Sequence, residues 1–425
     1  MNAEKKQENN AELDVPFKVA FKFWVKLGFI SFGGPAGQIA IMHKELVERR
    51  EWIDEKSFLH ALNFCMLLPG PEAQQLATYI GWRLHKIKGG IVAGAFFVIP
   101  SIFFLLALSF IYARYGNVNE VAALLDGFKP VVVAIVVEAV IKIGKRSLKT
   151  VMHFVIATLS FVGVQFFHVP FPLIVAAALL VGFIWSRHSE TKAEEANDES
   201  TRQPSRFYIL KVTLVCFLLW LVPLTTTLVI FGRENVATKL YLFFTQAAFV
   251  TFGGAYAVLA YVNQAVVSAG WITAEQAVDG LALAETTPGP LIMVLQFIGF
   301  MTGWQNAGSY DQTVFAVICA LLVTFATFLP SFLFVFAAGP YLEKIQSNAR
   351  LSGALGFVTA AVVGVILNLS LTFGSAVMLQ DTHLNIFALV CAVAAFTALY
   401  FFKIDVVSVV IAGGVIGLVK YLIIG

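Results

Sequence analysis

Long hydrophobic runs, separated by short polar segments, dominate the chain. A run of roughly 18 or more apolar residues is long enough to cross a bilayer as a helix. We expect nine full spans, at about 89–113, 121–143, 150–168, 170–186, 207–231, 312–338, 353–375, 383–402 and 404–424. The pattern therefore predicts an all-α polytopic membrane protein.

Two further apolar regions are each interrupted by the tripeptide Pro-Gly-Pro, at residues 69–71 and 288–290. Proline in a helix interior lacks the required N–H and clashes with the preceding turn, but it suits a first helical position. Each tripeptide should therefore end one helix and begin another. The arms around the first are 55–68 and 71–86, and an arm of about 14 residues rises only ~21 Å of the ~30 Å hydrocarbon core. We expect re-entrant hairpins, or up to about 13 crossings in total if the arms cross fully.

The second half repeats the landmarks of the first half in the same order. Phe-Gly-Gly at 32–34 returns at 252–254, Trp-Ile at 52–53 returns at 271–272, Pro-Gly-Pro at 69–71 returns at 288–290, and Pro-Ser at 100–101 returns at 330–331. The offset is nearly constant, apart from an insertion near residues 305–312, which indicates two homologous units. We divide the chain into a disordered N-terminal tail (1–15), a first transporter repeat (16–187), a cytoplasmic linker (188–206), a connecting transmembrane helix (207–231) and a second transporter repeat (232–425).

The positive charges are distributed unequally between the repeats. The stretch from Lys18 to Arg114 carries eleven Lys and Arg residues, whereas the corresponding stretch from Leu240 to Glu343 carries none. Because cytoplasmic loops collect Lys and Arg, the two Pro-Gly-Pro regions should enter the membrane from opposite faces. The single connecting helix would invert the second repeat. We therefore expect inverted-topology repeats, with the N-terminus in the cytoplasm and the C-terminus outside.

Composition agrees with a membrane protein and excludes several other classes. The chain is 59% hydrophobic and 13% charged, against roughly 25% charged residues in soluble proteins. The net charge of +3 gives no reason to expect a nucleic-acid partner. The four cysteines and seven histidines show no metal-ligand spacing, so no metal or cofactor is expected. No nucleophile–base signature suggests an enzyme, and a homodimer is left open.

Paired helix breaks in two halves of a transporter point to its substrate site. Helices that restart at Pro35, Pro71, Ala255 and Pro290 would direct free N–H groups and positive dipole ends at that site, which suits an oxyanion. The alternative is that Pro-Gly-Pro forms only a tight turn between two short spans. We favour the site because the two copies match.

The candidate substrate-binding residues are the breaks themselves and the polar residues near them. They are Gly33, Gly34, Pro35, Gln38, Asn63, Pro69, Gly70, Pro71, Gln74, Gln75, Tyr79, Arg83, Gly253, Gly254, Thr286, Thr287, Pro288, Gly289 and Pro290. Gln75, Tyr79 and Arg83 recur every four residues and so share one helix face, which offers an amide, a hydroxyl and a guanidinium. For Arg83, an interfacial role with its charge in the headgroup region is equally open.

Two acids beside the breaks, Glu72 and Glu285, are candidate proton carriers. An ionised carboxylate would repel an anionic substrate unless it were protonated, and acids within the membrane are functional hypotheses by default. Helix capping is the alternative for Glu72. For Glu138 we prefer an ion pair with Lys142, one turn further on, to a proton relay.

The chain resembles the long, two-repeat form of the chromate ion transporter family. The resemblance rests on Phe32, Gly33, Gly34, Pro35, Glu45, Trp52, Phe58 and the tripeptide 69–71, and on Phe252, Gly253, Gly254, Trp271, Glu285 and the tripeptide 288–290. It implies a carrier in the cytoplasmic (inner) membrane that exports chromate, confers chromate resistance, is linked to sulfate and uses the proton motive force.

Two departures make the halves inequivalent. Ala255 replaces the proline of the second Gly-Gly element, and Leu291 stands where the first half has Glu72. Our leading hypothesis is a secondary active transporter of chromate, with sulfate as the alternative substrate. An anion channel on the same scaffold and an intramembrane enzyme are the alternatives, and the latter has no supporting signature.

Overall fold

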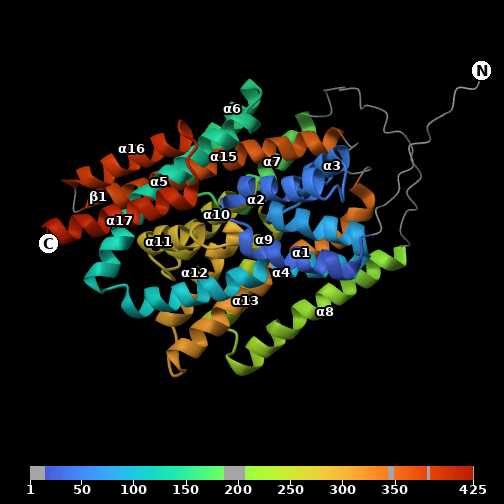
Figure 1. Cartoon of the computed structure of the whole chain (residues 1–425), viewed down its shortest axis with the longest axis horizontal. Helices are drawn as coiled ribbons and strands as arrows, with labels where there is room; N and C mark the ends of the chain where they lie inside the picture. The colour runs from blue at the N-terminus through green and yellow to red at the C-terminus, as the bar shows by residue number, and fades with distance from the viewer. Residues whose placement is uncertain (1–14, 186–205, 343–348, 381–382, 425) are drawn as a thin grey trace, which may run out of the picture.

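The computed structural model describes residues 15–185, 206–342, 349–380 and 383–424, and it is almost entirely helical (Figure 1). The predicted tail and linker lie, apart from Val15 and Arg206, outside the described residues. The first half contains α1 (Phe17–Ile30), α2 (Gly34–His43), the π-helix η1 (Lys44–Arg49), α3 (Glu55–Cys65), α4 (Glu72–Tyr115), α5 (Asn119–Ser147), α6 (Val151–Phe167) and α7 (Phe171–Trp185). The connecting helix is α8 (Arg206–Ile230).

The second half follows a similar order of helices, with additional short elements. It contains α9 (Val236–Val250), α10 (Ala255–Ser268), α11 (Ala274–Glu285), η2 (Leu291–Met293), α12 (Val294–Gln305), α13 (Gln312–Ala338), η3 (Gly339–Tyr341), α15 (Ala349–Met378), β1 (Leu379–Gln380), β2 (His383–Leu384), α16 (Ile386–Tyr400) and α17 (Val406–Ile424). Among the described residues, five helical segments are long and apolar enough to cross a membrane: α4, α8, α13 with η3, α15 and α17. The protein is therefore a multi-pass membrane protein.

Helix α4 is a hairpin of two arms rather than one straight rod. His85 (φ −137°, ψ 29°) and Lys86 (φ 54°, ψ −146°) leave the helical conformation and reverse the chain. Glycines line the contact between the arms: a Cβ added to Gly81 would lie 2.5 Å from the carbonyl oxygen of Gly89. Small residues allow two helices to approach this closely. The predicted break between a short arm and a full span is therefore confirmed.

The second half builds the same hairpin from α12 and α13. Here a loop from Asn306 to Asp311 joins the arms, in place of the tight reversal at His85 and Lys86. This loop is the predicted insertion near residues 305–312. The first arm begins in both halves at the Pro-Gly-Pro break that follows α3 or α11.

Long helices of each half pack against helices of the other half, so the two halves do not form separate units. Helix α5 of the first half packs against α16 and α17 of the second, and α15 of the second packs against α6 and α7 of the first (Figure 1). The crossing of α5 and α17 is close because Gly127 faces Gly413 and Gly417. Each half is therefore completed by the other.

One predicted span needs correction. The run at 383–402 was expected to be helical throughout, but α16 begins only at Ile386. Its first residues, His383 and Leu384, pair with Gln380 and Leu379 in a two-stranded antiparallel hairpin. Asn385 then caps the helix by accepting a hydrogen bond from the N–H of Ala388 at 3.1 Å.

Candidate functional site

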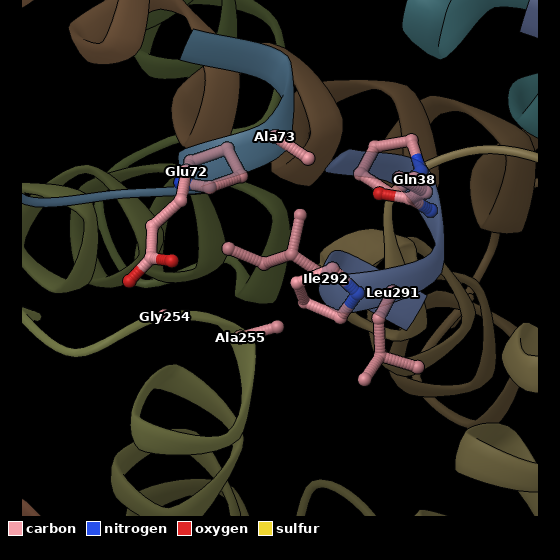
Figure 2. Close-up of a pocket in the computed structure, with 10 residues that line it drawn as sticks. Gln38, Glu72, Ala73, Gly254, Ala255, Leu291 and Ile292 are labelled. Carbon is pink, nitrogen blue, oxygen red and sulfur yellow. The ribbon is translucent and has the colours of Figure 1, made fainter. Parts of the chain in front are cut away.

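Four helices, two from each repeat, begin around one small cavity (Figure 2). They are α2 and α4 from the first repeat and α10 and η2 from the second. The cavity is lined by Pro35, Gln38, Pro71, Glu72, Ala73, Gly254, Ala255, Pro290, Leu291 and Ile292. The four helix starts predicted from the sequence thus meet at one place. Three of the predicted first residues are off by one position: α2 begins at Gly34 instead of Pro35, α4 at Glu72 instead of Pro71, and η2 at Leu291 instead of Pro290.

None of these four helix starts has a side-chain cap among the described residues. Of the helices that begin elsewhere, α1 and α5 are also uncapped, whereas six are capped by a side chain, namely that of Asp54, Thr150, Asn235, Thr273, Asp311 or Asn385. The first N–H groups of a helix have no partner within the helix, and they carry its positive dipole end. The cavity therefore concentrates uncapped N–H donors, which is the arrangement that binds anions.

The backbone before each of these helix starts requires glycine. Positive φ angles occur at Gly33, Gly34, Gly70, Gly253, Gly254 and Gly289, with values between 65° and 116°. A residue with a side chain adopts such angles only at a cost, whereas glycine adopts them readily. The Gly-Gly and Pro-Gly-Pro motifs are thus the turns that aim the helix starts at the cavity.

Each Pro-Gly-Pro turn is anchored to the opposite repeat. The N–H of Gly70 donates to the carbonyl of Thr251 at 3.1 Å, and the N–H of Gly289 donates to the carbonyl of Ser31 at 2.7 Å. Ser31 and Thr251 are equivalent positions, because each directly precedes Phe-Gly-Gly. Such reciprocal pairs are the signature of two-fold symmetry between two units. The pseudo-two-fold axis of the repeats therefore passes through the site.

The repeated Pro-Ser pair also reaches the opposite turn, but with different bonding in the two halves. The hydroxyl of Ser101, on α4, donates to the carbonyl of Pro288. The equivalent Ser331, on α13, lies against Gly70, where an added Cβ would be 2.8 Å from its Oγ. Among the described residues, the buried hydroxyl of Ser331 has no hydrogen-bond partner. The site is symmetric in its backbone and asymmetric in its polar contacts.

Buried glutamine side chains of the first repeat donate hydrogen bonds to both Pro-Gly-Pro turns. Gln38 Nε2 donates to the carbonyl of Gly289 at 2.5 Å, and Gln75 Nε2 donates to the carbonyl of Pro69 at 2.7 Å. Gln74, which is also fully buried, donates to a threonine hydroxyl one turn along α4. Of these three predicted residues, only Gln38 lines the cavity. The amides of Gln74 and Gln75 stabilise the structure around it.

Glu72 is the one ionisable side chain in the cavity wall. Its carboxylate points toward the turn before α10 (Figure 2), and a Cβ added to Gly254 would lie 3.5 Å from its Oε1. The guanidinium of Arg146, at the end of α5, is within electrostatic range of this carboxylate and contacts the sulfur of Met66 at 2.6 Å. Arg146 was missed by the sequence reading, because nothing local links it to a residue 74 positions earlier.

Glu285 lies behind the cavity and not in its wall. It is 3% exposed, and its Oε1 accepts a hydrogen bond from the hydroxyl of Tyr256 at 3.1 Å. Glu138 is within electrostatic range and forms the predicted ion pair with Lys142 at 2.7 Å. Only the carboxylate end of that pair is buried, since the Lys142 side chain is 63% exposed.

Of the predicted binding residues, only five line the cavity, namely Pro35, Gln38, Pro71, Gly254 and Pro290. Besides the remaining turn residues and the two glutamines, five predicted side chains lie away from it. Asn63 and Arg83 are exposed on other surfaces, and Tyr79 is buried between two aromatic rings. The hydroxyls of Thr286 and Thr287 donate to carbonyls of α11. The four-residue spacing of Gln75, Tyr79 and Arg83 does give one helix face, but α4 turns that face away from the cavity.

The cavity is narrow. Its volume is about 10 Å³, which is roughly the space that one water molecule needs. An anion with four oxygens fits only if the helix starts move apart. Among the lining residues, the donors available to an anion are backbone N–H groups and the side-chain amide of Gln38.

The family model for chromate transporters matches residues 19–183 and 238–418, one match in each repeat. A chromate transport protein of Pseudomonas aeruginosa is 31% identical over 93% of this chain and 91% of its own length. A chromate transport protein of Cupriavidus metallidurans is 28% identical over 94% of this chain and 92% of its own length.

A shorter relative corresponds to a single repeat. An uncharacterized transporter of Bacillus subtilis is 26% identical over 98% of its own length but only 43% of this chain. No solved structure matches the chain significantly. The repeat seen in the fold is therefore also a unit in related sequences.

Proposed function

Because the chain belongs to the chromate transporter family, we propose that it is a secondary active transporter that exports chromate across the cytoplasmic membrane. Its N-terminus lies in the cytoplasm and its C-terminus outside, and the proton motive force drives the export. Sulfate, which has the same shape and charge as chromate, is a competing substrate of the same site.

The observation that carries this proposal is the convergence of four uncapped helix starts from two repeats on one cavity. Backbone N–H groups offer directed hydrogen bonds to an oxyanion without a full positive charge that would hold it too tightly. Pseudo-symmetry supports alternating access, because two equivalent repeats can exchange conformations around a shared site. The narrow cavity favours such a carrier over a channel that is open throughout.

Glu72 is the residue that links the anion to a proton in this proposal. Its carboxylate shares the cavity with the substrate, so an ionised Glu72 and a dianion repel each other at short range. Proton binding to Glu72 removes that repulsion and lets the anion enter. Glu285 supplies a second protonatable group, at the end of the helix that leads into the second Pro-Gly-Pro turn.

The test is labelled chromate uptake into everted membrane vesicles, with and without an imposed proton gradient and with sulfate as competitor. We expect uphill uptake when the medium is acidic or the lumen is electrically positive, because one proton and one dianion that enter the cavity together carry a net charge of −1. Sulfate should inhibit this uptake. The Glu72→Gln variant should bind chromate but lose the dependence of uptake on the gradient, with a fall in uphill uptake of at least about tenfold.

Glu51→Gln is a matched control, since Glu51 is exposed and does not line the cavity. It should transport as the wild type does when both are expressed equally. Downhill flux alone, with no accumulation under any gradient, would instead identify an anion channel. Gradient-driven uptake that is unchanged in Glu72→Gln would remove Glu72 from the coupling mechanism.

A further inference from the structure

A second cavity, separate from the first, is polar and lies between the two repeats. It is lined by Asp126, Lys129, Glu275, Ala376, Val377, Asn385, Phe387, Ala388 and Lys420. These residues come from α5, α11, α15, α16 and α17, and from the residue that caps α16. Its volume is about 140 Å³, enough for several water molecules.

A buried acid lies next to this cavity. Asp279 is one helical turn beyond Glu275 on α11, so the two side chains share a helix face. Asp279 is 4% exposed, and its Oδ2 accepts a hydrogen bond from the hydroxyl of Tyr112 at 2.9 Å. Its buried Oδ1 has no hydrogen-bond partner among the described residues. A buried carboxylate with an open oxygen is costly, and a proton on that oxygen removes the cost.

The charged groups around Asp279 come from three neighbouring elements. Lys129 and Asp126 of α5 are within electrostatic range, as is Glu275 of α11 itself. Lys129 is already paired with Asp126, with 2.9 Å between Nζ and Oδ1. Helix α17 contributes Lys420 to the shared cavity. The neighbouring helices α10 and α12 contain no charged residue, and α15 has only Arg350, at its far end.

This set of groups suits a proton better than either an oxyanion or a metal ion. Three carboxylates against two lysines give the region a net negative charge, which repels a dianion. The lysines repel metal cations, and no cluster of three potential metal ligands occurs in the described residues. A proton needs only one open carboxylate oxygen and water to deliver it.

We propose that Asp279 is a further proton-binding site of this transporter, distinct from Glu72 and Glu285, that it is loaded through the polar cavity, and that it acts on the substrate site through α11. An O–H bond of a hydronium ion in the cavity breaks as an O–H bond forms at Oδ1, and that bond breaks again when the proton passes to water after the transporter has changed conformation. The inference rests on the proposed proton-driven function.

Helix α11 connects this acid mechanically to the substrate cavity. The helix is fixed at its start by a capping box between Thr273 and Gln276, and it ends at Glu285, three residues before the second Pro-Gly-Pro turn. Six residues separate Asp279 from Glu285, a rise of about 9 Å. A shift of α11 when Asp279 is neutralised therefore moves the turn that aims η2 at the cavity.

The experiment uses the full chain in proteoliposomes, with labelled chromate inside and outside and a pH-sensitive dye. In Asp279→Asn we expect chromate accumulation driven by a proton gradient to fall at least about tenfold, while chromate–chromate exchange at equal pH stays near the wild-type rate. Glu120→Gln, which changes an exposed acid in the first turn of α5, is the matched control and should leave both rates unchanged. In Tyr112→Phe, loss of the donor to Oδ2 should move the midpoint of the pH–rate profile to higher pH.

Infrared difference spectra of the purified protein provide a readout that does not depend on transport. A carboxylic acid band should appear on acidification of the wild type, and one component of that band should be missing in Asp279→Asn. Wild-type accumulation in Asp279→Asn would overturn the inference, and so would equal loss of exchange and accumulation, which indicates a structural role. If the wild type shows the Asp279 band but no uphill transport, the proposed proton drive fails while the proton site stands.

Discussion

The turns before the substrate cavity limit which side chains the chain can accept there. At Gly289 (φ 104°) an added Cβ would overlap the hydroxyl of Ser101, and at Gly70 (φ 116°) it would lie 2.8 Å from the hydroxyl of Ser331. Gly232 has a similar φ of 85°, but an added Cβ would meet nothing within 4 Å. An alanine at Gly232 would therefore add backbone strain alone, whereas an alanine at Gly70 or Gly289 would add both backbone strain and steric overlap.

We expect Gly232→Ala to lower the free energy of unfolding by about 1–2 kcal/mol, the cost of a left-handed conformation alone. Gly70→Ala and Gly289→Ala should cost more. Gly289→Ala should be the most damaging, because the Ser101 hydroxyl is held by a hydrogen bond and cannot easily move aside. Thermal unfolding in detergent checks the order; equal losses at all three positions would contradict the steric argument.

Outside the membrane-spanning segments, Glu45 in η1 links stability to pH. Its side chain is 9% exposed and lies 2.6 Å from the guanidinium of Arg49 and 3.5 Å from that of Arg50. Burial raises the pKa of Glu45, but the hydrogen bond and the charge of Arg49, with help from Lys26 and Arg50, outweigh it and hold the pKa below the ordinary value of 4.5. The ionised form is therefore favoured in the folded state.

The sign of the pH effect follows from this lowered pKa. The stabilisation by Glu45 is fully present above pH 4.5, the value for the unfolded chain, and it is lost as pH falls through the lower pKa of the folded state. The difference in melting temperature between the wild type and Glu45→Gln should be constant near neutral pH and should shrink below pH 4.5. Glu51→Gln, at an exposed position nearby, should show no such trend.

At the scale of the elements, the reversal inside α4 stores backbone strain at one residue. Lys86 has φ 54° and ψ −146°, a region that is populated almost only by glycine and costs other residues about 1–3 kcal/mol. Lys86→Gly should therefore raise the free energy of unfolding by an amount of that order. The loss of the Lys86 contact with the Trp82 ring, 5.9 Å from Nζ to the ring centre, is small by comparison.

Lys88→Gly is the matched control, since Lys88 is exposed and lies within the helical part of the second arm. There glycine should destabilise by roughly 0.5–1 kcal/mol. The free energy of unfolding should thus rise in Lys86→Gly and fall in Lys88→Gly. This result would establish that the backbone at the reversal is strained. A loss of stability in both would show that the turn is not strained.

The elements that the sequence predicted correctly are those with a local cause. Pro-Gly-Pro breaks a helix wherever it lies, and a shifted repeat offset reveals an insertion, so the hairpins and the loop from Asn306 to Asp311 could be predicted. By contrast, the direction in which a helix face points depends on the elements that pack around the helix in the fold. Arg83 was therefore grouped with the cavity on spacing alone, although the structure leaves it on the surface.

At the scale of the whole molecule, the exchange of helices between the repeats could not be predicted from either repeat alone. The packing of α5 on α16 and α17, and of α15 on α6 and α7, joins residues that are far apart in the chain. The same long-range contacts create the pair of Tyr112 and Asp279, which are 167 positions apart, and bring Arg146 near Glu72. Periodicity and motifs report neighbours in sequence, and they do not reveal such pairs.

The pseudo-two-fold relation between the repeats makes a prediction about membrane sidedness. The reversal at Lys86 and the loop containing Ser309 occupy equivalent places in the two hairpins, and both residues are exposed. With inverted repeats, a single cysteine at Lys86 should react with an impermeant thiol reagent only from the cytoplasm, and one at Ser309 only from outside. The four native cysteines must first be replaced.

A parallel arrangement of the repeats would expose both positions to the same side, so the two labelling patterns are mutually exclusive. The distribution of Lys and Arg favours the inverted arrangement, because the first repeat carries the cytoplasmic charges and the second hairpin has none. The reciprocal hydrogen bonds of Gly70 and Gly289 are compatible with either arrangement. They show that a two-fold axis passes through the site, but they do not give its direction relative to the membrane. Labelling decides whether that axis lies in the membrane plane, which is the condition for one cavity to be reached alternately from both sides.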